Sequence, residues 1–158
     1  MGLILTLDAS VFVSACRSCE PGYTASRTLL SSMRDEGTPL IEPGILPVEV
    51  GAALCRTGSD PVIARDFAFA ILSLPYLTLA NVDERLARRA VALATECRLR
   101  GADALYAAVA VHYGARLVTL DGEQLRRAPA AVHACKPDTA ARLVRRQRRL
   151  AAPRPETT

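Results

Sequence analysis

The chain has 158 residues, half of them apolar and 23% charged, which suits one domain with a full hydrophobic core and excludes a disordered protein. The formal net charge of +4 is unevenly spread. Residues 1–139 carry 14 Arg or Lys against 15 Asp or Glu, whereas residues 140–158 carry six Arg against one Glu. A basic patch on the body of the protein therefore does not follow from the overall charge. The basic end either contacts phosphates or is a solvated, flexible tail, and a charge run at a chain end favours the tail.

No apolar run is long enough to span a bilayer, and none has the form of a signal peptide. The five cysteines are odd in number and show no disulfide spacing, so we expect reduced thiols and a cytoplasmic location. Cys16 and Cys19 have the spacing of a zinc-ligand pair. Because no second pair follows, we assign them to the loop after the first strand.

In chain order, the first apolar run predicts a buried strand over residues 3–7. A helical pattern follows over residues 24–36 and ends at a glycine, and residues 39–42 form a short second strand. Residues 46–56 are helical. An Asp-Pro pair then opens a further helix over residues 61–74, because Asp is a good cap and Pro suits the first helical turn.

The second half of the chain continues the alternation, with a third strand over residues 76–80 and a long helix over residues 83–99. The helix at 102–113 is apolar on almost every side, which predicts a central, buried position. A fourth strand over residues 116–120 and a short helix over residues 122–127 follow.

A weak fifth strand over residues 131–135 completes the predicted sheet. Strands that alternate with helices indicate an α/β fold in which a parallel sheet of four or five strands is flanked by helices in three layers. We expect one domain over residues 1–139 and an Arg-rich, flexible tail over residues 140–158.

Two of the predicted strands end in the same way, with a carboxylate just past an apolar run. Asp8 follows the first strand and Asp121 follows the fourth. Ligands of open parallel sheets bind in the crevice beyond the carboxyl ends of the strands. If these two strands are neighbours, both carboxylates lie at that crevice, where their repulsion favours a bound cation.

Two further acids lie in unusually apolar segments. Glu49 is the only charge in residues 45–54, and Asp103 opens the most apolar helix of the chain. A carboxylate in such a run is costly to bury unless it is paired or binds a metal. Taken singly, each acid also has a structural explanation: Asp103 as a helix cap, Glu49 as a partner of Arg56, and Asp121 as a turn residue.

Carboxylates and hydroxyls are the ligands of Mg²⁺ or Mn²⁺. Such a site activates a metal-bound water and stabilises the charge on a phosphodiester during hydrolysis. The chain has no Walker lysine motif, no His-Glu-x-x-His and no Gly-x-Ser-x-Gly. The four acids together therefore favour metal-assisted phosphodiester chemistry.

The order of four motifs resembles the PIN domain of VapC-type toxins of toxin–antitoxin pairs. They are Leu-Asp-Ala-Ser at 7–10, Pro-Val-Glu-Val at 47–50, Gly-Ala-Asp-Ala-Leu-Tyr-Ala-Ala at 101–108 and Leu-Val-Thr-Leu-Asp at 117–121. The similarity spans about residues 3–132. It implies an endoribonuclease that uses Mg²⁺ or Mn²⁺, cuts RNA, is held by a small antitoxin protein and forms a homodimer.

The resemblance also implies roles for particular residues. The acids that hold the metal and carry the reaction would be Asp8, Glu49, Asp103 and Asp121, with Ser10 and Thr119 in support. Ser10 would orient a metal water or a carboxylate, and Thr119 would support Asp121. Glu123 is interpreted as a surface turn acid, and Tyr106 as a core residue rather than a platform for a base.

Two alternative functions compete with the nuclease: a phosphatase or phosphoacceptor on a similar sheet, and a binding module without turnover. A phosphatase of the haloacid-dehalogenase type needs Asp-x-Asp after the first strand, where Ser10 stands in place of the second acid. A receiver-like phosphoacceptor needs a late lysine, and the only lysine, Lys136, lies at the exit of the last strand. A PIN module that binds RNA or a partner without turnover is not indicated, because all four acids are present. A metal-free RNase would need His112 and His133 in one pocket, which their positions do not favour.

Overall fold

The structure is a computed structural model that describes residues 2–151, and these residues contain a single parallel sheet. Its strand order is β3-β2-β1-β4-β5, with β1 at the centre. The strands are β1 (Leu5–Leu7), β2 (Leu40–Pro43), β3 (Leu77–Ala80), β4 (Arg116–Val118) and β5 (Ala134–Cys135). The predicted strands are all present. β2 has the predicted length but begins one residue later, and the other four are shorter than predicted.

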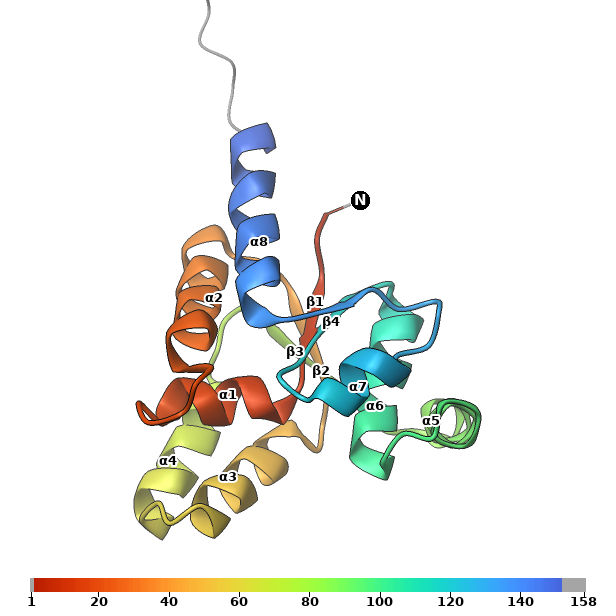
Figure 1. Cartoon of the computed structure of the whole chain (residues 1–158), viewed down its shortest axis with the longest axis horizontal. Helices are drawn as coiled ribbons and strands as arrows, with labels where there is room; N and C mark the ends of the chain where they lie inside the picture. The colour runs from red at the N-terminus through yellow and green to blue at the C-terminus, as the bar shows by residue number, and fades with distance from the viewer. Residues whose placement is uncertain (1, 152–158) are drawn as a thin grey trace, which may run out of the picture.

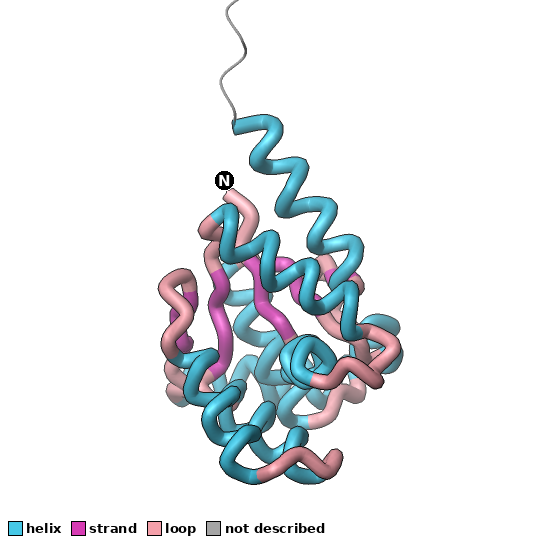
Figure 2. The backbone as a smooth tube through the Cα atoms, turned by 90° about the vertical axis from the view of Figure 1, so that its left-hand side faces the viewer, coloured by secondary structure: helices cyan, strands magenta, loops and turns pink. Residues whose placement is uncertain are grey.

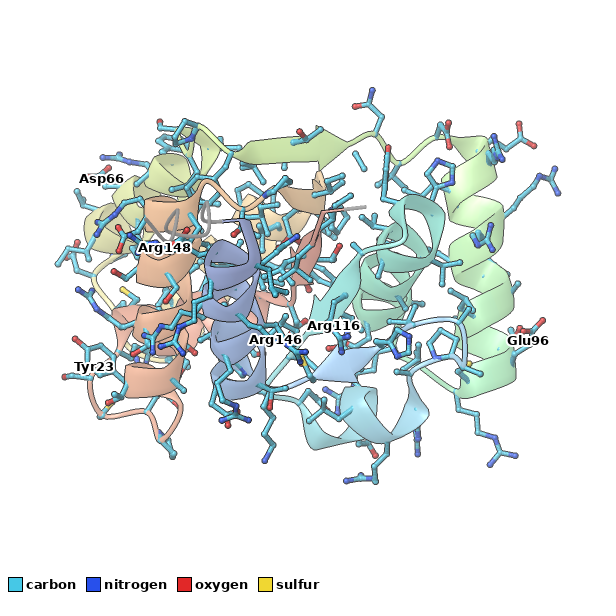
Figure 3. All side chains as sticks on the ribbon, turned by 90° about the horizontal axis from the view of Figure 1, so that it is seen from above. Tyr23, Asp66, Glu96, Arg116, Arg146 and Arg148 are labelled. Carbon is cyan, nitrogen blue, oxygen red and sulfur yellow. The ribbon has the colours of Figure 1, made fainter. Side chains whose placement is uncertain are left out.

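Helices cover both faces of the sheet, which confirms the predicted three-layer α/β fold. They are α1 (Ala9–Cys16), α2 (Tyr23–Glu36), α3 (Leu46–Arg56), α4 (Pro61–Leu72), α5 (Glu84–Cys97), α6 (Gly101–Tyr113), α7 (Gly122–Arg127) and α8 (Pro137–Ala151). Seen from above, the sheet separates α2 and α8 on one side from α5 and α6 on the other (Figure 3). None of the helices in residues 2–151 has the length and apolar character needed to cross a membrane.

The core forms around the central strand, because both leucines of β1 are fully buried. Helix α6 lies against β1, β2 and β4 and buries Ala104 together with residues 106–110, which confirms its predicted central position. Its small alanine side chains allow close packing against the sheet and against α5, where a second apolar cluster forms.

Helix α1 was not predicted from the sequence, and it replaces part of the expected loop after the first strand. The Asp8 carboxylate accepts a hydrogen bond from the Ser10 amide and so caps the helix. Val11, Phe12 and Ala15 point into the core. The chain therefore passes directly from β1 into α1 at Asp8, at the carboxyl end of the strand.

Helix α8 differs from the expected flexible tail, because residues 137–151 form a helix packed against α2. Figure 2 shows α2 and α8 side by side across one face of the sheet. Ala140, Ala141 and Val144 are buried in the main core, while most of the α8 arginines are exposed. Arg148 reaches toward α2 and pairs with Glu36 at 3.1 Å (Figure 3). Residues 152–158 of the expected tail lie outside the described residues.

Candidate active site at the carboxyl edge of the sheet

Asp8 and Asp121 follow neighbouring strands, because β1 pairs with β4 in a parallel register that includes Leu7 opposite Val118. The expectation that these strands are neighbours is therefore confirmed. Thr119 links the two acids: its hydroxyl donates to Asp8 Oδ2 at 3.3 Å and accepts from the Asp121 amide at 2.9 Å. This end of the sheet, with Asp8, Glu49, Asp103 and Asp121 around it, is called the acidic edge below.

Ser10 forms a second connection between the two strand exits. Its amide donates to Asp8 Oδ2 at 3.0 Å, and its hydroxyl accepts from the Leu120 amide at 3.2 Å. The first turn of α1 is thereby joined to the segment after β4. Ser10 and Thr119 thus hold the Asp8 carboxylate and the Asp121 backbone in a fixed relation.

Asp121 caps a helix with one oxygen only. Its Oδ1 accepts from the amides of Glu123 at 2.6 Å and Gln124 at 3.0 Å, which begins α7. Glu123 itself pairs with Arg127 at 3.6 Å on the surface, as expected for a turn acid.

Asp103 lies in the first turn of α6 and does not cap it, since the cap position is Arg100. The fully buried Gln124 of α7 donates to the Asp103 carbonyl at 3.4 Å. That contact ties the start of α6 to the helix that Asp121 caps. Sequence reasoning missed Gln124, because nothing in a short polar segment signals complete burial.

Glu49 lies in the first turn of α3, half-buried and beside the hydroxyl of Tyr106. Tyr106 is fully buried, as expected for a core residue, and its hydroxyl has no well-formed hydrogen bond among the described residues. Burial raises the pKa of the Glu49 carboxyl and the charge of Asp8 raises it further, while Tyr106 and Arg56 lower it. Helices α1, α3, α6 and α7 meet around the acidic edge in Figure 1.

Negative charge at the acidic edge is poorly compensated. Burial raises the pKa of the Asp8 carboxyl, the charge of Asp121 raises it further, and hydrogen bonds from Ser10 and Thr119 oppose the shift. Burial, followed by the charges of Asp8 and Asp121, raises the pKa of Asp103 to about 6. Asp103 therefore lies within electrostatic reach of the other three predicted acids.

The raised pKa of Asp103 predicts a pH-dependent gain in stability for Asp103→Asn in metal-free protein. The folded state holds the Asp103 proton more tightly than the unfolded chain, so this group lowers stability as the pH rises from about 4 to about 6. The variant should melt higher than wild type at pH 7.5, and the gain should shrink toward pH 4. Thermal unfolding in EDTA measures it. Asp66→Asn, on the exposed face of α4, is the control, and an equal gain there would contradict the prediction.

The residue types at this site suit a hard divalent cation, but the carboxyl groups are too far apart to hold one. Every predicted ligand is a carboxylate, and the buried Oε2 of Glu49 has no hydrogen-bond partner among the described residues. Within residues 2–151, however, no three Asp, Glu, His or Cys side chains stand close enough together to hold one ion. Binding Mg²⁺ or Mn²⁺ would require these carboxyl groups to close on it.

Glu42 is the acid that sequence reasoning missed. It lies in β2 and is fully buried, with one carboxyl oxygen accepting from the Leu7 amide and the other unpartnered. Burial raises its pKa well above the ordinary value, and the charge of Asp8 adds to the shift. The signal that identified Asp8, a carboxylate at the end of an apolar strand, was present here as well.

Residues 5–130 match the PIN domain family. Because that match covers most of the chain, the protein belongs to the PIN-domain family. No curated protein sequence matches the chain.

Several solved structures share the fold. PAE2754 from Pyrobaculum aerophilum has a TM-score of 0.67 at 22% identity, covering 92% of this chain and 99% of that one. VapC20 from Mycobacterium tuberculosis, described as a sarcin-ricin loop cleaving toxin, has a TM-score of 0.65 at 18% identity, covering 82% and 98%. VapBC2 from Rickettsia felis, bound to a promoter DNA fragment, has a TM-score of 0.63 at 16% identity, covering 85% and 98%. At these identities the likeness establishes the fold.

Proposed function

We propose that this protein is a metal-dependent endoribonuclease that acts as the toxin of a toxin–antitoxin pair in the cytoplasm. The observation that carries the proposal is the acidic edge itself. On a PIN-family fold, Asp8 and Asp121 follow two adjacent parallel strands, and burial together with the repulsion of the other acids raises the pKa of Asp103 to about 6 although Arg100 lowers it. Asp8, Glu49, Asp103 and Asp121 are the proposed catalytic and metal-holding residues, with Ser10 and Thr119 in support.

The chain's own residues supply a rigid base for this chemistry. Asp8 is 7% exposed and is held by Ser10 and Thr119, so its carboxylate has little freedom. Glu49 and Asp103 are half-exposed and sit on helix first turns that face the same edge. Mg²⁺ or Mn²⁺, when bound, supplies Lewis acidity that lowers the pKa of water and offsets charge on the phosphodiester. Of the four acids, Asp8 is thus fixed before substrate arrives, whereas Glu49 and Asp103 would have to move toward the ion.

A protein partner is supported by an exposed apolar surface on α3 and α4. A groove of about 430 Å³ lies between α3 and α4 and includes Val48, Phe69 and Leu72. The side chains of Val48 and Phe69 are 69% and 59% exposed. Exposed apolar side chains that cluster in this way mark interaction sites. Because several structures of the same fold come from toxin–antitoxin pairs, an antitoxin is the partner proposed for this surface. A homodimer is proposed from the family resemblance alone.

The direct test is cleavage of RNA by the purified chain with Mg²⁺ or Mn²⁺. We expect internal cuts without a cyclic phosphate, because water rather than the ribose 2′-hydroxyl is the proposed nucleophile. With the 3′-oxygen as the leaving group, the products carry a 5′-phosphate and a 3′-hydroxyl. EDTA should abolish the cutting, and added Mn²⁺ should restore it. End-labelled RNA and mass spectrometry of the products measure both. A 2′,3′-cyclic phosphate, or full activity in EDTA, would rule the mechanism out.

The same assay separates the alternative functions. Hydrolysis of a phosphate monoester without RNA cleavage would indicate a phosphatase on this fold. RNA that is retained but never cut, with or without metal, would indicate a binding module.

A further inference from the structure

The pairing of β1 with β2 breaks off early on the side of the sheet where Glu42 lies. β1 and β4 are in register over three residue pairs, whereas β1 and β2 share only the pair Leu5 with Leu40. β2 continues to pair with β3 as far as Pro43. The two strands therefore separate just before the acidic edge, and β2 stays with β3.

The Glu42 carboxyl takes the position of a missing backbone hydrogen bond. The Leu5 amide donates to the Pro39 carbonyl at 3.0 Å, as in a regular ladder. The next amide on that side of β1 belongs to Leu7, and in a regular parallel ladder it would donate to the Ile41 carbonyl. Instead the Ile41 carbonyl accepts from the Thr6 hydroxyl at 2.8 Å, and the Leu7 amide donates to Glu42 Oε1 at 2.5 Å.

The sequence also removes the reciprocal bond of the ladder. Pro43 has no N–H, so the ladder could not return a bond to the Leu7 carbonyl. Without Glu42 the last residue of β1 would be tied to the sheet only from the β4 side, where the Asp8 amide donates to the Val118 carbonyl at 2.9 Å. The Glu42 side chain thus supplies the hydrogen bond that holds the end of β1 to β2.

Burying the carboxyl of Glu42 costs folding free energy that a purely structural role would not require. Glu42 is fully buried, and its Oε2 has no partner among the described residues. An apolar side chain of similar volume would avoid the cost of burying a carboxyl. Glu42 contacts the amide of Leu7, the residue directly before Asp8, so it lies next to the strand end that carries Asp8.

We propose that Glu42 is a positioning residue: its carboxyl oxygen fixes the end of β1, and with it the Asp8 carboxylate, by replacing a backbone hydrogen bond of the sheet. The catalytic part of this inference rests on the proposed nuclease function, while the structural part does not. Leu7 directly precedes Asp8, so loss of the acceptor lets the Asp8 carboxylate drift. A displacement of that kind, of about 1 Å, is enough to cost roughly 100-fold in rate.

Two variants of Glu42 separate the hydrogen bond from the packing. Glu42→Leu removes the acceptor while roughly keeping the volume, and Glu42→Gln keeps an acceptor oxygen. In Glu42→Leu we expect kcat for RNA cleavage to fall by about 10- to 100-fold with little change in KM, and thermal stability to be retained or raised. In Glu42→Gln we expect activity close to wild type. The control is Glu96→Gln, an exposed glutamate on α5.

Hydrogen exchange at the Leu7 amide, followed by NMR in metal-free protein, tests the inference without any enzyme assay. We expect exchange at Leu7 to accelerate by at least about tenfold in Glu42→Leu and to stay slow in Glu42→Gln and Glu96→Gln.

Unchanged exchange in Glu42→Leu overturns the proposal. Full activity of that variant, or an equal loss of activity in Glu42→Gln, overturns it as well. If Glu42→Leu does not fold, Glu42→Met is the second apolar variant, because its unbranched chain adapts to the site. If wild type cuts no RNA, the nuclease function fails, and Leu7 exchange alone decides whether Glu42 holds β1.

Discussion

Asp8→Asn should reduce RNA cleavage by about 100-fold or more while leaving the protein folded, because it removes a charge from the site but keeps the local hydrogen bonds. Asp8 Oδ2 accepts from the Ser10 amide and the Thr119 hydroxyl, and an asparagine oxygen can accept in its place. Asn is also as good a helix cap as Asp. Loss of the charge relieves repulsion at Asp103 and Asp121, so thermal stability should be equal or higher in the absence of metal.

A matched control is available in Asp60→Asn. Asp60 caps α4 through the amides of Val62 and Ile63, so it repeats the capping role of Asp8 at an exposed position away from the acidic edge. We expect wild-type cleavage from that variant. Mn²⁺ should raise the melting temperature of wild type and of Asp60→Asn, but not that of Asp8→Asn, since only a ligand that binds the folded state stabilises it. Full cleavage by Asp8→Asn would remove this residue from the proposed site.

Truncation before residue 143 should destabilise the protein by several kcal/mol, a large part of the roughly 5–15 kcal/mol that ordinarily holds a domain together. The deletion removes Val144, which is 1% exposed, from the main core. It also removes the contacts of Arg145 with Ser32 and of Arg148 with Glu36, and uncovers the α2 surface. Chemical denaturation followed by circular dichroism measures the loss.

Two point variants on α8 show which of its contacts cause the loss of stability on truncation. Val144→Ala should cost about 1–3 kcal/mol, because it leaves a cavity in the core. Arg149→Ala, on the exposed side of the same helix, should stay within about 0.5 kcal/mol of wild type. A truncated protein that unfolds at the wild-type denaturant concentration would show that α8 adds nothing to the core.

The sequence alone was sufficient for the elements that have strong local signals. The bounds of α3 and α7 were predicted without error. The structure adds that Pro47 lies in the first turn of α3 and that Asp121, whose structural explanation from the sequence was a turn, caps α7. The apolar run of β1 and the nearly uniform α6 were equally clear, because both are buried on more than one side. The match of residues 5–130 to the PIN family agrees with the order of the four acidic motifs. The metal-binding role of the four acids stays a prediction.

Elements with weak local signals were missed. Helix α8 buries Ala140, Ala141 and Val144, a helical spacing that was present in the sequence. Five arginines around these small residues made the segment look like a solvated terminus. Its order comes from packing against α2, more than a hundred residues earlier in the chain, which no local pattern can report.

The sequence by itself determined the alternation of strands and helices, the parallel class of the sheet and the acids Asp8 and Asp121 that follow two of its strands. These depend on periodicity and on residues within a few positions of one another. Only the tertiary structure decided how these acids affect one another. The pKa of Asp103 depends on charges that come from separate elements, and the burial of Glu42 depends on a strand 35 positions away along the chain. Electrostatic and hydrogen-bond energies depend on distance in space, and distance in space is set by the fold.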